Sequence, residues 1–150
     1  MKTWSLLVLR ISLGLLMLIW GVDKLVNVEH GMLVSEHFYL GAFSMPALLK
    51  VFGVAQMVLG FFIILGLFGQ WLYPVLITIT AVTLLAVWRS IIDPWGWYLE
   101  GANALFFPSL IIFAGALVLL AFRELDAYSL DARREEVGGD VRERAAGFLE

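Results

Sequence analysis

The 38 consecutive residues from 51 to 88 contain no Asp, Glu, Lys or Arg, and this run constrains the fold more than any other part of the chain. As one helix it would be about 57 Å long at about 1.5 Å per residue. A bilayer core is only roughly 30 Å thick. The run therefore predicts two membrane-spanning helices, at about 47–67 and 71–89. The segment GLFGQW supplies glycines for the turn between them, and Pro74 suits the first turn of the second helix.

Two further spans flank this run. The N-terminal stretch resembles a secretory signal, but its charged region is only Lys2, Arg10 interrupts the apolar run, and no small-x-small cleavage site follows. We therefore expect an uncleaved membrane helix at about 4–26. Residues 101–122 are again free of charge and predict a fourth span at about 102–123.

The composition agrees with a membrane protein. Of the 150 residues, 61% are hydrophobic, and the mean hydropathy is +0.90. A soluble domain of this length cannot bury so much apolar surface. The sequence thus predicts an all-α fold, an integral membrane four-helix bundle over residues 1–126 with outer loops at 27–46 and 90–101.

Beyond the fourth span lies a polar tail, residues 127–150. The Gly138-Gly139 pair is expected to interrupt any helix there, and the high charge predicts a solvated, partly disordered segment. Lysine and arginine near the span ends set membrane orientation. We predict both termini in the cytoplasm and the two loops on the outer face of the cell (inner or plasma) membrane. The residues that favour this orientation are Lys2, Arg123, Arg133 and Arg134; those that weaken the bias are Lys24, Lys50 and Arg89.

Arg10 is the deepest cation in the predicted spans. A charged side chain in lipid costs roughly 2.5–3.5 kcal/mol, so it usually faces protein or water. Helical spacing places four further residues on its face: Gly14, Met17, Gly21 and Lys24. This face can pack on another helix or leave room for a lipid-like ligand. We expect Arg10 to pair with an acid of the C-terminal region, such as Glu124 or Asp126, or of another subunit; the alternative is snorkelling to the interface.

Gln56 falls in the middle of the second span, where lipid cannot satisfy its amide. It is therefore predicted to face the interior of the bundle. A hydrogen bond between helices, beside Gly53 and Gly60, explains it, and so does a hydrogen bond to a quinone carbonyl. Asn103, at the start of the fourth span, admits the same two explanations.

The segment from 27 to 41 holds both histidines, His30 and His37, each directly after a glutamate. A zinc or di-iron site needs three or more placed ligands, and the Glu-x-x-His spacing of helical di-iron sites is absent. No span contains a histidine for haem, and without cysteine no thiolate site can form. We predict no metal here. The segment is interpreted instead as an amphipathic stretch that rests on the membrane through Met32, Leu33, Phe38 and Tyr39.

Three motifs resemble the DoxX family of small membrane proteins. They are LRISLGLLMLIWGVDKL in the first span, MPALLKVFGVAQMVLGFFIILGLFGQ in the second, and DAYSLDARR after the last. The resemblance covers about residues 6 to 134. It implies a four-helix membrane protein, often a subunit of an oxidoreductase linked to the quinone pool, as in the thiosulfate:quinone oxidoreductase. The family commonly has glutamate at the position of Gln56, and glutamine cannot carry a proton.

Two functions follow as expectations. The first is a quinone-interacting membrane subunit with a hydrophobic groove for quinone or lipid. The residues expected to line it are Arg10, Gly14, Trp20, Lys24, Gln56 and Asn103. The chain has no redox-metal ligand set and no nucleotide motif, so it is not expected to catalyse alone or to hold a covalent cofactor. The alternative is a structural accessory subunit that anchors or seals a larger complex. Partners are then membrane or peripheral subunits and lipid, and a net charge of -3 gives no reason to expect nucleic acid.

Overall fold

The computed structural model describes residues 2–38, 40 and 45–147, and this part of the chain is helical with no strand. Four helices are long and apolar enough to cross a membrane. They are α1 (Lys2–Val26), α3 (Pro46–Leu65), α4 (Gly69–Ala86) and the span Ala104–Ala121, formed by η1 (Ala104–Phe106) and α6 (Pro108–Ala121). The four predicted spans are thus confirmed as apolar helices. Because α4 begins earlier than predicted, Pro74 lies inside it rather than in its first turn.

The shorter helices are α2 (Val28–Phe38), α5 (Trp88–Ile92), η2 (Arg123–Leu125) and α7 (Leu130–Gly147). The predicted break at Gly138-Gly139 is wrong, because α7 continues through both glycines. The structure likewise shows a helix where the sequence predicted a partly disordered tail. The Ser129 hydroxyl accepts the Ala132 N–H at 3.1 Å and so caps the start of α7. Most residues of α7 other than its two glycines are good helix formers.

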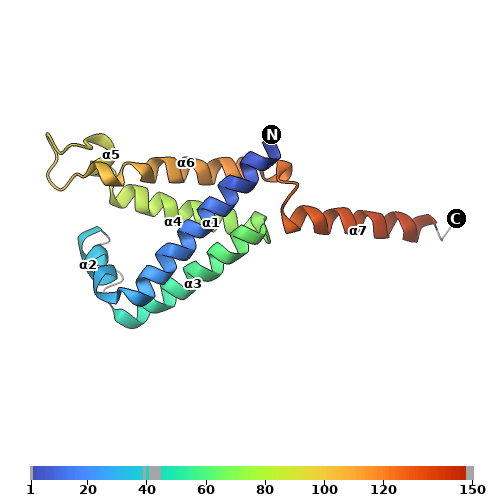
Figure 1. Ribbon diagram of the computed structural model, residues 1–150, viewed down its shortest axis with the longest axis horizontal. Helices are drawn as coiled ribbons and strands as arrows, with labels where there is room; N and C mark the ends of the chain where they lie inside the picture. Colours follow the sequence, from blue (N-terminus) through green and yellow to red (C-terminus); the bar gives the residue numbers. More distant parts are fainter. Residues whose placement is uncertain (1, 39, 41–44, 148–150) are drawn as a thin grey trace.

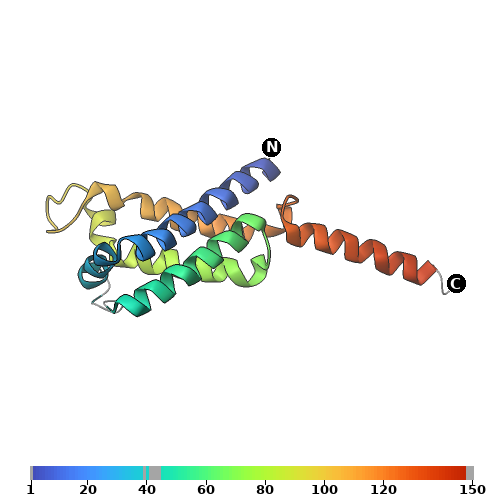
Figure 2. The same ribbon diagram turned by 60° about the horizontal axis from the view of Figure 1, so that its bottom comes forward.

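Figure 1 shows the spans as two pairs. Helix α1 lies beside α3, helix α4 lies beside α6, and the first pair runs obliquely to the second. Helices α2 and α5 lie at one end of the molecule. The N-terminus, the α3–α4 turn and the start of α7 lie at the other end, from which α7 projects away from the spans (Figures 1 and 2).

Glycines bring α1 and α3 into backbone contact. A Cβ atom built on Gly14 would lie 2.8 Å from the carbonyl oxygen of Gly60, and one on Gly53 would lie 2.9 Å from that of Gly21. Such small residues let two membrane helices approach closely. The face of α1 that begins at Arg10 is therefore turned toward another helix, one of the two outcomes that the sequence left open.

The buried core joins both pairs of spans. It consists of Leu13, Met17, Leu59, Ile63, Tyr73, Leu76, Ala116 and Leu119. Outside this core, large apolar side chains remain exposed on every span, as with Val8 on α1, Phe61 on α3, Trp71 on α4 and Ile111 on α6. A hydrocarbon solvent accommodates such a surface without the cost it would have in water.

At the end opposite the termini, Asp93 organises the turn after α5. Its Oδ2 atom accepts the N–H groups of Tyr98 at 2.6 Å and Leu99 at 2.9 Å. These backbone hydrogen bonds, that of Tyr98 first, hold the pKa of Asp93 below its usual range. Within the same turn the rings of Trp95 and Trp97 stack with centroids 5.3 Å apart.

This turn is expected to loosen in acid. Because the pKa of Asp93 is lowered in the folded chain, its carboxylate stabilises the turn above the ordinary value of about 4, and this contribution is lost as the pH falls through the lowered pKa. The near-ultraviolet circular dichroism of the stacked tryptophans measures the change. Asp93→Asn should abolish this acid transition, and an identical transition in that variant would contradict the assignment.

Candidate functional site

A buried ion pair joins the first span to the segment after the last. Arg10 Nε lies 3.0 Å from Asp126 Oδ2, and the two residues are each only 1% exposed. Arg10 Nη2 also donates a hydrogen bond to the carbonyl oxygen of Tyr128 at 3.0 Å. The prediction that Arg10 pairs with an acid of the C-terminal region is confirmed, with Asp126 rather than Glu124 as the partner.

The α3–α4 turn also contacts this ion pair, through Gly66. Gly66 ends α3 with a φ of 68°, in the left-handed region that glycine adopts without strain. A Cβ atom at this position would overlap the Arg10 guanidinium. The guanidinium therefore packs directly against the backbone of the turn, and only glycine fits there.

Asp131, in the first turn of α7, also binds the α3–α4 turn. Its two carboxylate oxygens accept the N–H groups of Phe68 at 3.0 Å and Gly69 at 2.8 Å. Its own N–H donates to the carbonyl oxygen of Gly66 at 3.0 Å. A residue of α7 thus caps the start of α4, where unpaired N–H groups and the helix dipole favour a carboxylate.

We call the segment from Asp126 to Asp131 the C-terminal clamp. It holds Arg10 of α1 and the α3–α4 turn, and the ring of Tyr128 packs on that of Trp4 with centroids 5.2 Å apart. Burial raises the pKa of Asp126, and the Arg10 guanidinium opposes this shift. The clamp is a fixed electrostatic joint between the spans and α7.

Asp131→Ala is expected to destabilise the folded chain by about 0.5–2 kcal/mol, because two N–H groups at the start of α4 lose their acceptor. Unfolding of the purified chain in mixed micelles measures this change. Glu135→Ala, an exposed acid one turn further along α7, is the matched control. Equal stability of the two variants would mean that the cap contributes nothing.

The other predicted site residues lie further along α1 and α3. Gln56 is 2% exposed, and its Nε2 atom lies 3.5 Å from the sulfur of Met17, so the prediction that it faces the interior is confirmed. Gly14 lies against the Gly60 backbone, so no ligand fits between α1 and α3 at this position. Partly buried Lys24 donates to the carbonyl oxygen of Trp20 at 3.2 Å, and its ammonium lies 5.5 Å from the centre of the Phe52 ring.

Asn103 lies apart from these residues. It is exposed at the end of the molecule opposite the clamp, where its Oδ1 atom accepts the Leu105 N–H at 2.9 Å and caps η1. The structure therefore spreads the six predicted groove residues along a packed helix interface and a distant turn. It does not gather them around one cavity.

His30 and His37 are both exposed on α2, which turns Gly31 and Ser35 inward. The ring of Phe38 packs on that of Phe106 with centroids 5.3 Å apart and so ties α2 to the start of the fourth span. Within residues 2–38, 40 and 45–147, no three histidine or acidic side chains form a group that could hold a metal ion. Absence of metal stays a prediction, which elemental analysis tests. Tyr39 lies outside the described residues.

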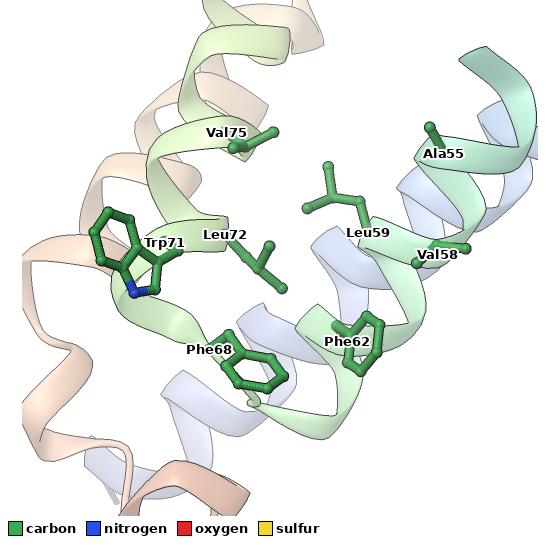
Figure 3. A pocket seen from close by; sticks show the side chains of 8 residues that line it. All are labelled: Ala55, Val58, Leu59, Phe62, Phe68, Trp71, Leu72 and Val75. Atoms are coloured by element: carbon green, nitrogen blue, oxygen red, sulfur yellow. The ribbon is translucent and has the colours of Figure 1, made fainter. Parts of the chain in front are cut away.

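The structure also has an apolar groove that the sequence did not indicate. Its volume is about 440 Å³, and we call it the α3–α4 groove (Figure 3). It is lined by Ala55, Val58, Leu59, Phe62, Phe68, Trp71, Leu72 and Val75. Leu59, Leu72 and Val75 point into the space between the helices, while Phe62 and Phe68 lie near the turn that joins them. In the sequence, the feature that could have indicated this groove is the group of aromatic residues on both sides of the predicted turn.

Comparisons with protein-family models, with curated proteins and with solved structures found no match to this chain. The class that the structure defines is therefore architectural: an all-helical chain with four candidate membrane spans, described over residues 2–38, 40 and 45–147.

Proposed function

We propose that this chain is an integral membrane accessory subunit that anchors a larger complex and presents α7 to protein partners. In this proposal the four spans form a DoxX-like bundle in the inner or plasma membrane, with both termini and α7 in the cytoplasm. The observation that carries it is the C-terminal clamp. Arg10, Asp126 and Asp131 fix the base of α7 to two spans and a turn, although α7 itself projects away from them (Figure 1).

The use of the polar side chains supports an anchoring role over direct quinone chemistry. Among the residues expected to bind a quinone, Arg10 contacts Asp126 and the Tyr128 carbonyl, and the Gln56 Nε2 atom contacts the Met17 sulfur. Arg10 Nη1 and Gln56 Oε1 are buried without a hydrogen-bond partner in the described part of the chain. In the α3–α4 groove, the Trp71 indole is the one side chain among the eight lining residues that can donate a hydrogen bond. A quinone has two carbonyl acceptors, and this lining offers a single donor, so the accessory function is the better supported of the two.

The proposed function is tested on native membranes solubilised in mild detergent. We expect the chain to migrate in a complex larger than itself. Replacing residues 133–147 with a flexible Gly/Ser sequence should release it from that complex, because the clamp is kept and only the projecting helix is lost. A chain that runs alone, or a complex unchanged by the replacement, contradicts the proposal. Quinone content of the isolated complex and of the isolated chain separates the two functions.

The proposed orientation has its own test. The chain has no native cysteine, so single cysteines can be introduced cleanly. His37→Cys on α2 should react with a membrane-impermeant reagent added outside intact cells. Val137→Cys on α7, where the native side chain is 64% exposed, should react only after permeabilisation. The reverse pattern would invert the orientation.

A further inference from the structure

We propose that the α3–α4 groove binds one acyl chain of an anionic phospholipid, with the headgroup phosphate at Arg134. This inference rests on the proposed membrane location of the spans, and the purified chain alone can test it. The groove lies between two helices that are long and apolar enough to cross a membrane, and its eight lining residues are all apolar or aromatic. Hydrocarbon is the chemistry that such a lining accepts.

A cation stands at the end of the groove where the two helices join. The Arg134 guanidinium lies 5.9 Å from the centre of the Phe68 ring, and that ring in turn lies 5.9 Å from the ring of Phe62. Phe62 and Phe68 both line the groove. Arg134 is exposed, and no acid in the described part of the chain forms an ion pair with it. A phosphate complements an exposed guanidinium that rests on an aromatic ring.

The nearby helix terminus does not compete for this phosphate. The N–H groups of Phe68 and Gly69 at the start of α4 are already bound by the Asp131 carboxylate. Arg134 is therefore the group beside the groove that is left to attract a negative charge. A neutral lipid or a quinone would use the groove but gain nothing from Arg134.

The shape of the groove suits a flexible chain. Its lining comes from α3 and α4, which the short α3–α4 turn joins, and its volume is about 440 Å³. An acyl chain can follow the narrowing space from Ala55 and Val75 to Phe62 and Phe68 (Figure 3). A helix of another subunit would not need Arg134, so the Arg134 variants distinguish these two occupants.

Native mass spectrometry of the detergent-purified full chain tests the proposal, with phosphatidylglycerol and phosphatidylcholine of identical acyl chains as probes. We expect phosphatidylglycerol to bind more tightly. Arg134→Gln should weaken it about fivefold, the effect of one arginine at an anionic surface, and leave phosphatidylcholine unchanged. Arg134→Lys should retain most of the preference. Arg89→Gln, which removes an exposed arginine at the opposite end of the molecule, should change neither lipid.

A second pair of variants tests the groove itself. Val58→Trp fills it and should weaken both lipids, whereas Val51→Trp, at an exposed α3 position outside the lining, should not. Circular dichroism confirms that each variant keeps its helices. Equal binding of the two lipids, no effect of Arg134→Gln, or no effect of Val58→Trp would each overturn the proposal. Displacement of the phospholipid by a short-chain quinone would also overturn it, since the groove would then prefer an uncharged ring to an acyl chain.

Discussion

Arg10→Leu and Asp126→Leu are each expected to destabilise the folded chain by about 3–5 kcal/mol, because each leaves one member of a buried ion pair without its partner. Without Arg10, Asp126 is expected to take up a proton, since burial already raises its pKa. The double variant should be more stable than the sum of the single losses predicts, because neither charge then remains buried. Unfolding in mixed micelles gives all three free energies.

Glu124→Gln is the matched control for this ion pair. Glu124 is an exposed acid two residues from Asp126, and its replacement should change the unfolding free energy by no more than about 0.5 kcal/mol. Arg10→Lys should recover only part of the stability, because lysine cannot reach both Asp126 and the Tyr128 carbonyl with a planar fork. If Arg10→Leu matched the control, Arg10 would merely snorkel to the interface and the clamp would lose its electrostatic basis.

Gly60→Ala is expected to destabilise the chain by about 1–3 kcal/mol, the usual effect of an overpacked contact. The added Cβ would lie 2.6 Å from the Gly14 carbonyl oxygen and 2.9 Å from the Leu18 nitrogen. Both are backbone atoms, so α1 and α3 must move apart. Cross-linking between cysteines placed on the two helices should fall together with stability.

Gly115→Ala provides the comparison for this substitution. The nearest atom to its new Cβ would be Leu9 Cδ1 at 3.2 Å, the end of a side chain that can rotate away. This variant should retain the stability of the parent chain. A Gly60→Ala variant as stable as Gly115→Ala would show that the helices tolerate a wider separation than their backbone contact implies.

Hydropathy and charge were sufficient to predict the four spans, because lipid requires each crossing segment to satisfy its own backbone. The partner of Arg10 was also predictable, since the acids of the 27–46 and 90–101 segments lie at the other end of the spans. The sequence predicted Gly66 in the turn but not its contact with Arg10, and it did not predict the role of Asp131. Both contacts arise only when the segment after α6 returns to the α3–α4 turn, and no local pattern indicates them.

Helices α2 and α7 were missed because hydrophobic periodicity in the sequence does not show the contacts and the cap that stabilise them. The helix α2 within the predicted 27–46 loop packs Gly31 against Leu49 of α3, where a Cβ atom would lie 2.6 Å from Leu49 Cδ2. Helix α7 continues through Gly138 and Gly139, although a glycine is about 1 kcal/mol less favourable than alanine inside a helix, since the start of α7 is capped by Ser129 and most of its other residues are good helix formers. The position of Gly14 and Gly21 has a similar cause: these small residues on one face of α1 lie against the backbone of α3, and that contact is formed only in the folded chain.

The clamp also imposes an order on biosynthesis. Arg10 emerges from the ribosome first, and the Tyr128 carbonyl that binds it follows 118 residues later. At about 5–20 residues per second, the first helix waits roughly 6–24 s in the membrane before its partners exist. During that interval α1 can associate with α3 through their glycines, but the arginine end must stay hydrated at the bilayer surface. The clamp can thus close only after the segment from Asp126 to Asp131 has been made, and a nascent chain arrested before Asp126 leaves the Arg10 end of α1 without its buried partner.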